Sequence, residues 1–129
     1  MPSLESERLH LAVKAHDDAA RRWAITDRGT GEALGEAWLL VCEEGFEVGW
    51  CVDEPRRGNG YATEAGRAVL QHAFDDLALD QVYAFIEEDA RASQRVAEKL
   101  GMEHVRSEPG DEEVAPWREY AIARGGQRD

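Results

Sequence analysis

One run of residues constrains this chain more than any other: Pro55-Arg56-Arg57-Gly58-Asn59-Gly60-Tyr61-Ala62-Thr63-Glu64-Ala65. It joins a segment of alternating apolar residues to a segment with helical apolar spacing, which predicts a strand, a tight loop and a helix. The two glycines allow a tight turn and a close approach of backbone to ligand, and the N–H groups at a helix N-terminus favour an anion. Two arginines enter the same turn. The sequence therefore predicts a site for a phosphorylated ligand.

Apolar periodicity predicts the elements around this loop. Residues 46–52 alternate apolar with small or polar side chains, which indicates a strand with one buried face. After the loop, apolar residues from Ala65 to Leu77 predict a helix with Thr63 as its N-cap. A second helix is expected over 90–100, ending at Gly101 as a left-handed cap and carrying on one side Ala92, Val96 and Leu100. Further strands are expected at 8–13, 23–26, 33–42, 81–87, 102–107 and 117–123, with one face of the strand at 33–42 formed by Leu34, Trp38 and Leu40.

Length predicts one domain over residues 1–124, followed by a disordered tail at 125–129, and the order of strands and helices predicts that this domain is mixed α/β. No apolar run approaches the roughly 20 residues of a membrane span, and the first residues lack a secretory signal, so we expect a cytoplasmic protein with no membrane partner. Cys42 and Cys51 flank a turn at 43–45 and should not face each other, so both are expected to be reduced.

The charge balance narrows the range of partners. There are 15 basic and 27 acidic side chains, a net charge of −12. A chain with this net negative charge is a poor partner for nucleic acid, because its acidic side chains would repel the phosphates. Cationic acceptors would be attracted, although the acid excess can also serve solubility alone.

Two motifs resemble a known family. Arg57-x-x-Gly60-x-Ala62 resembles the pyrophosphate loop of the GNAT acetyltransferase superfamily, and Gly60 to Ala65 is similar to the version in its ribosomal-protein-alanine N-acetyltransferase (RimJ/RimL-like) subgroup. A signature helix of that subgroup resembles the run Ser93-Gln94-Arg95-Val96-Ala97-Glu98-Lys99-Leu100-Gly101-Met102. The resemblance covers roughly residues 33 to 124, and the first thirty residues match poorly.

The resemblance implies a GNAT-like splayed sheet with acetyl-CoA as co-substrate in the notch between the strands at 46–52 and 81–87. The N–H groups from Gly58 to Thr63 would hold the pyrophosphate, and the pantetheine arm would pair with the backbone at 50–52. A backbone N–H near Val52 would polarise the thioester carbonyl. The expected cofactor-binding residues are Trp50, Cys51, Val52, Arg56, Arg57, Gly58, Asn59, Gly60, Tyr61, Ala62, Thr63 and Ser93.

The resemblance indicates the catalytic residues less directly than the cofactor-binding residues. Ser93 matches the family serine that can protonate the leaving thiolate, and the tyrosine acid of other members would fall at Ala97. Ala90 stands where the subgroup has an asparagine that contacts the cofactor. Two carboxylates remain open as the base: Glu47 on the cofactor-side strand and Glu112 in the last hairpin. The histidines lack metal-ligand spacing, so no metal is expected, and His72 is expected to be a packing or surface residue.

These features predict an N-acyltransferase that moves an acetyl group directly from acetyl-CoA to a primary amine. One alternative is a degenerate member that binds CoA without turnover, as a sensor or interaction module. Another is a small α/β protein that binds a different phosphorylated ligand through the same loop. The link at 14–22 is too short for the helices that wall the acceptor site in the family. The acceptor site is therefore expected either to be unusually open or to be completed by a second subunit in a homodimer.

Overall fold

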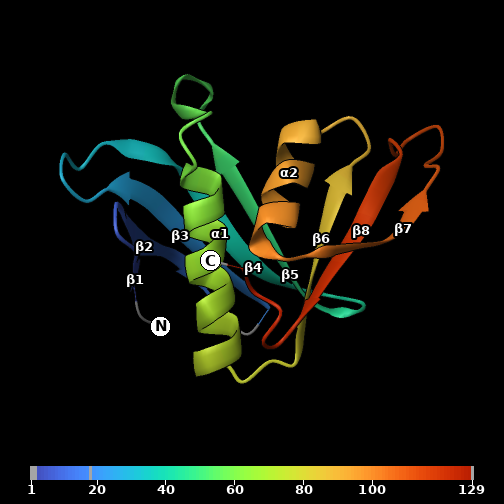
Figure 1. Cartoon of the computed structure of the whole chain (residues 1–129), viewed down its shortest axis with the longest axis horizontal. Helices are drawn as coiled ribbons and strands as arrows, with labels where there is room; N and C mark the ends of the chain where they lie inside the picture. Colours follow the sequence, from blue (N-terminus) through green and yellow to red (C-terminus); the bar gives the residue numbers. More distant parts are fainter. Residues whose placement is uncertain (1–2, 18, 129) are drawn as a thin grey trace.

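The computed structural model describes residues 3–17 and 19–128 and shows a mixed sheet with two main helices (Figure 1). The eight strands stand in the order β1-β2-β3-β4-β5-β6-β8-β7. They are β1 (Leu4–Glu5), β2 (Leu9–His16), β3 (Ala20–Asp27), β4 (Ala33–Cys42), β5 (Gly45–Val52), β6 (Gln81–Glu87), β7 (Glu103–Glu108) and β8 (Trp117–Ala123). The helices are the 3-10 turn η1 (Glu54–Arg56), α1 (Tyr61–Gln71), the π-helical turn η2 (His72–Asp76) and α2 (Arg91–Leu100). The predicted mixed α/β fold is confirmed.

The sheet is divided at the boundary between β5 and β6. Strands β1 to β5 form successive antiparallel hairpins, and β6, β8 and β7 form a second antiparallel set. In the described chain the two sets pair at one position, where Glu47 lies opposite Tyr83 in parallel register. Figure 1 shows β5 and β6 diverging toward the end at which α1 and α2 begin. The predicted splay is therefore confirmed, and both strands present open edges there.

Both helices cover the same face of the sheet, and the core fills the space between (Figure 1). The buried side of α1 includes Ala65, Val69 and Leu70, and burial of each large side chain stabilises the fold by about 1.5 to 3 kcal/mol. Gly66 lets α2 approach closely, since a Cβ there would lie 2.9 Å from Leu100 Cδ1. The sheet contributes chiefly Leu9, Leu11, Trp23, Ile25, Leu39, Val48, Val82 and Tyr120. This packing places the N-termini of α1 and α2 side by side at the open end of the splay.

Strand β4 does not keep one face to the core along its length. Leu34 is buried together with Ala37 and Leu39, whereas Trp38 and Leu40 are only partly buried. The expectation that Leu34, Trp38 and Leu40 share a face is therefore wrong. The cause is an irregularity at Gly35, whose φ is +155° and where the β3–β4 register shifts. Such a bulge moves every later side chain to the opposite face.

The helices also differ in part from the prediction. α1 begins at Tyr61 with Gly60 as its N-cap, and Thr63 is buried within the first turn. Only glycine readily adopts the left-handed φ of +79° at Gly60, so the helix starts earlier than a threonine cap would place it. α2 ends at Gly101 with φ +100°, as predicted. Ala92 is exposed, however, and the buried positions of α2 are Gln94, Ala97 and Leu100.

The segment expected as a link between strands is mostly strand, because β2 continues to His16 and β3 starts at Ala20. At the other end, the Arg128 N–H donates to the Leu100 carbonyl (3.2 Å) and Arg67 Nε donates to the Arg128 carbonyl (3.1 Å). The division into a domain at 1–124 and a disordered tail at 125–129 stays a prediction, and residue 129 lies outside the described part. Among the described helices, none has the length and apolar character to cross a membrane.

Glu64, in the first turn of α1, ties the helix to β2. Its carboxylate accepts hydrogen bonds from Ser6 Oγ (2.5 Å), from the Arg8 N–H (2.8 Å) and from Arg8 Nε (2.7 Å). Partial burial opposes ionisation, but these hydrogen bonds outweigh it and lower the pKa of Glu64. The folded state therefore favours the charged carboxylate.

We expect Glu64→Gln to reduce the free energy of unfolding at neutral pH by about 1 to 2 kcal/mol, since hydrogen bonds to a charged group contribute on this order and Arg8 is partly exposed. Because the folded pKa is lowered, this stabilisation is present above the unfolded pKa of about 4.3 and is lost as pH falls through the folded pKa. Urea unfolding at neutral pH and at about pH 3 measures the change, and the two proteins should converge in acid. Glu54→Gln, which alters an exposed carboxylate of η1, is the control. A difference that is undiminished in acid would contradict the assignment.

Candidate active site

A cleft of about 690 Å³ opens where β5 and β6 part and where both helices begin. One wall is the glycine loop with the first turn of α1, and the other is the exposed side of α2. Its lining residues are Trp50, Cys51, Val52, Arg56, Arg57, Gly58, Gly60, Tyr61, Ala62, Thr63, Asp89, Ala90, Arg91, Ala92, Ser93, Arg95, Val96 and Lys99. The structure thus brings together every cofactor-binding residue expected from the sequence except Asn59, whose side chain instead donates to the Arg56 carbonyl (3.0 Å).

The glycine loop is shaped to receive an anion. Gly58 and Gly60 have φ of +84° and +79°, and a Cβ at Gly58 would meet no atom within 4 Å, so the loop leaves open space. The first helical hydrogen bond of α1 runs from the Glu64 N–H to the Gly60 carbonyl (3.0 Å). The N–H groups of residues 61–63 precede that bond and have no carbonyl partner within the helix. An anion at this end would be bound by these donors and favoured by the helix dipole.

Arg56 and Arg57 support the loop in different ways. Arg56 Nη2 lies 2.7 Å from the Glu32 carboxylate, which anchors it to the β3–β4 turn. Arg57 Nε donates to the Val52 carbonyl (3.0 Å), which ties the loop to the end of β5. Both arginines line the same cleft as the N-terminal residues of α1.

The cleft is basic although the chain is acidic. Five cationic side chains line it, two from the loop and three from α2, and the described lining includes a single carboxylate, Asp89. The three on α2, namely Arg91, Arg95 and Lys99, are absent from the sequence-based site. Their four-residue spacing was a usable signal, but the side of α2 that faces the loop is fixed only by tertiary packing.

Ser93 lies in the first turn of α2, partly buried and facing the cleft. Its neighbour Gln94 is buried, and Gln94 Nε2 donates to the carbonyls of Glu87 (3.0 Å) and Glu88 (2.9 Å). These hydrogen bonds tie the start of α2 to the end of β6 and so fix the position of Ser93. Sequence reasoning missed this role of Gln94, for which a polar residue on the buried side of a helix was the available signal.

The two candidate bases lie apart from Ser93. Glu47 is partly buried at the base of the splay, and burial, with a smaller contribution from Glu44, raises the pKa of its carboxyl. Strand alternation places Glu47 on the same face as Cys51, which lines the cleft about 13 Å further along β5. Glu112 is exposed in the loop between β7 and β8 and is not among the lining residues. The structure therefore joins neither carboxylate directly to Ser93.

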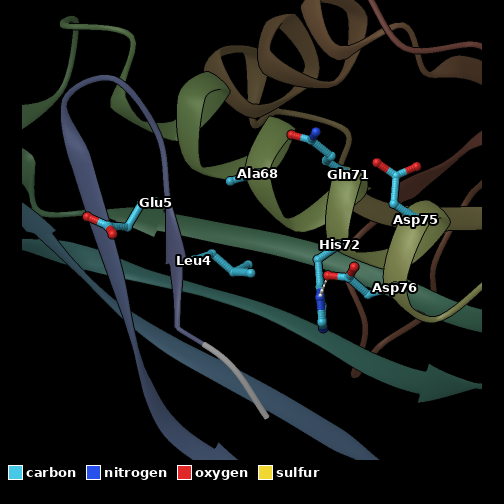
Figure 2. Close-up of a pocket in the computed structure, with 7 residues that line it drawn as sticks. All are labelled: Leu4, Glu5, Ala68, Gln71, His72, Asp75 and Asp76. Atoms are coloured by element: carbon cyan, nitrogen blue, oxygen red, sulfur yellow. Dashed lines mark hydrogen bonds and ion pairs between the residues drawn. The ribbon is translucent and has the colours of Figure 1, made fainter.

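A smaller cavity of about 160 Å³ lies near the opposite end of α1 (Figure 2). His72 is buried there, with Nδ1 2.6 Å from Asp76 Oδ2 and with its ring edge-on to Trp23. Its buried Nε2 has no hydrogen-bond partner among the described residues. His72 is remote from the glycine loop and acts as a packing residue, as the sequence predicts.

A splayed sheet with a glycine loop and a basic cleft at its open end is an arrangement that can receive an anionic ligand beside two exposed strand edges. Residues 3–103 match the family described as acetyltransferase (GNAT) domain. The chain belongs to this family of acetyltransferases.

Individual proteins are also similar to this chain in sequence or in fold. The Bacillus subtilis (strain 168) protein YkkB is 35% identical over 89 residues, which is 66% of this chain and 52% of that protein. The chain thus spans about half the length of this curated relative. The structure of the acetyltransferase from Agrobacterium tumefaciens str. C58 matches with a TM-score of 0.81 at 22% sequence identity. The match covers 96% of this chain and 95% of that chain. At this identity the likeness shows the fold alone.

Two further solved structures carry named acceptors. A putative ribosomal-protein-serine acetyltransferase from Vibrio cholerae has a TM-score of 0.81 at 14% identity, with 94% of this chain and 97% of that chain covered. A spermidine N-acetyltransferase variant from the same organism has a TM-score of 0.74 at 17% identity, and the match covers 84% of this chain and 67% of that chain. Both share the fold of this chain.

Proposed function

We propose that the protein is an N-acyltransferase that moves an acetyl group from acetyl-CoA to a primary amine by direct transfer. The observation that carries this proposal is the basic cleft with its glycine loop at the open edge of β5, with Ser93 on the facing helix. The loop N–H groups and Arg57 would hold the pyrophosphate. The open edge of β5 at 50–52 would pair with the pantetheine arm.

The reaction sets the tasks of the side chains. The amine nitrogen bonds to the acetyl carbon, the carbon–sulfur bond breaks, the amine loses a proton and the departing sulfur gains one. In the proposal, the Ser93 hydroxyl donates to the sulfur and is reprotonated by solvent, and a backbone N–H near Val52 polarises the carbonyl. Glu47 or Glu112 accepts the proton of the amine, directly or through water.

A cationic amine is the acceptor class that we propose. Burial, with a smaller contribution from Glu44, raises the pKa of the Glu47 carboxyl, and a bound ammonium would favour the charged form of this carboxylate. Spermidine, which is named as the acceptor of one Vibrio protein, falls in this class. The fold shared with the ribosomal-protein-serine acetyltransferase keeps the ribosomal-protein subgroup as our proposal. A cytoplasmic location, a homodimer and the absence of nucleic-acid and membrane partners stay predictions.

The test is thiol release from acetyl-CoA with a panel of polyamines, aminoglycosides and peptides with basic or acidic N-termini. Cationic amines should react fastest, and salt should weaken their advantage. Products are confirmed by a gain in mass of one acetyl group. Turnover without preference for cationic amines would contradict the acceptor class, and CoA binding without turnover on any amine would indicate the binding-module alternative.

The pH profile identifies the base. A carboxylate base with a raised pKa works only once it is deprotonated, so the rate should rise as pH passes through that raised pKa and again as the amine itself loses its proton. Glu47→Gln should remove the lower limb if Glu47 is the base, and Glu112→Gln is the matched alternative. If neither variant alters the profile, both assignments are wrong.

A further inference from the structure

The wall of the cleft that faces the glycine loop carries a row of basic side chains. Arg91, Arg95 and Lys99 are four residues apart on α2, so they project from the same side of the helix, one per turn, over about 12 Å. All three line the cleft. We call these three residues the basic row.

The basic row lacks acidic partners. Many cations elsewhere in the fold are paired, as Arg8 is with Glu64 and Arg118 is with Glu88. In the described chain no carboxylate lies within 4.0 Å of a basic-row nitrogen, although the protein has 27 acidic side chains. The row is therefore free to bind an anion from outside.

Two electrostatic effects within α2 disfavour the basic row. Like charges four residues apart repel each other and destabilise a helix. Arg91 is the first residue of α2, where the positive end of the helix dipole disfavours a cation. Lys99, in the last turn, is favoured by the dipole, so only the first part of the row is unexplained by helix stability. An anion bound between the row and the loop would offset both penalties.

Acetyl-CoA offers two phosphate groups to such a cleft. Its pyrophosphate fits the loop N–H groups, as in the proposed function on which this inference rests. Its second group is the 3′-phosphate of the ribose, a monoester close to doubly charged at neutral pH with three strong acceptor oxygens. The described cations of the lining beyond the loop are the three of the basic row.

We propose that the basic row binds the ribose 3′-phosphate and makes the protein selective for CoA over 3′-dephospho-CoA. Arg95 is central, and its planar guanidinium can form a two-point contact with a phosphate. Arg91 and Lys99 flank it. Since the side chains are exposed, added salt weakens the selectivity.

The experiment compares two ligands on three proteins by calorimetry. CoA and 3′-dephospho-CoA are titrated into the parent, into the double variant Arg95→Gln/Lys99→Gln, and into Arg21→Gln. Arg21 is a basic residue of β3 outside the cleft lining and without a described ion pair, so it is the control for loss of a positive charge outside the cleft. The parent should prefer CoA by about 10- to 100-fold, as expected for one or two charge-assisted contacts. The double variant should bind CoA as weakly as 3′-dephospho-CoA, with its affinity for 3′-dephospho-CoA unchanged.

Kinetics gives a second readout. The double variant should have a raised KM for acetyl-CoA with kcat unchanged, because the 3′-phosphate contact is the same in the ground state and the transition state. Equal affinity of the parent for the two ligands would overturn the inference while leaving the proposed function in place. An equal loss for both ligands in the double variant would also overturn it, since the row would then be structural. If neither ligand binds the parent, the proposed function itself fails.

Discussion

Ala62→Glu is expected to lower the affinity for acetyl-CoA by about 100-fold or more, the loss of roughly two charge-assisted hydrogen bonds. Ala62 is the second residue of α1 and lines the cleft at the end where the N–H groups of residues 61–63 precede the first helical hydrogen bond. A carboxylate there would fill the space and repel a pyrophosphate. The fold should persist, because an acidic residue in the first turn of a helix is favoured by the dipole.

The control for this variant is Gln71→Glu, which places the same charge at the exposed far end of the same helix. It should leave the affinity for acetyl-CoA near that of the parent. Calorimetry measures the affinities, and thermal unfolding verifies that each variant is folded. Unchanged affinity in a folded Ala62→Glu protein would exclude the glycine loop as the pyrophosphate site.

Local patterns predicted the fold well where a strand or helix is regular. The alternation at 46–52 corresponds to β5, with Val48 and Val52 buried, and the helical spacing after the loop corresponds to α1. The prediction that Leu34 shares a face with Trp38 and Leu40 failed, because the bulge at Gly35 cannot be seen in a periodic pattern. A Cβ at Gly35 would lie 2.0 Å from the Cys51 carbonyl oxygen, so glycine is required there by a contact with the neighbouring strand.

The residues of the candidate site also differ in whether a local sequence pattern could locate them. The glycine loop and Ser93 could be located from sequence because each lies within a short motif. The basic row could not, since the side of α2 that faces the loop depends on Leu100 packing at Gly66. Glu47 and Glu112 stay unresolved as bases for a related reason. A catalytic base must lie close to the acceptor nitrogen, and no local sequence pattern determines that distance for either carboxylate.

Removal of the Ser93 hydroxyl tests the proposed protonation of the departing sulfur. Ser93→Ala should lower turnover by about 10²- to 10⁴-fold if general acid catalysis is fully lost, with little change in acetyl-CoA affinity. Ser93 lines the cleft, and its hydroxyl makes no hydrogen bond with the described residues, so it is available to a ligand. Deletion of the hydroxyl costs no hydrogen bond within the described fold, so a fall in rate would report on the reaction.

Ser93→Thr is the matched control, because threonine keeps a hydroxyl at this position and should retain most of the turnover. Single-turnover acetylation of an acceptor confirmed in the amine panel separates the chemical step from product release. Gln94→Leu should act indirectly, since it removes the hydrogen bonds that hold the start of α2 to β6, and should lower thermal stability together with rate. A Ser93→Ala protein that acetylates at the parent rate would remove the serine from the mechanism and leave protonation of the sulfur to solvent.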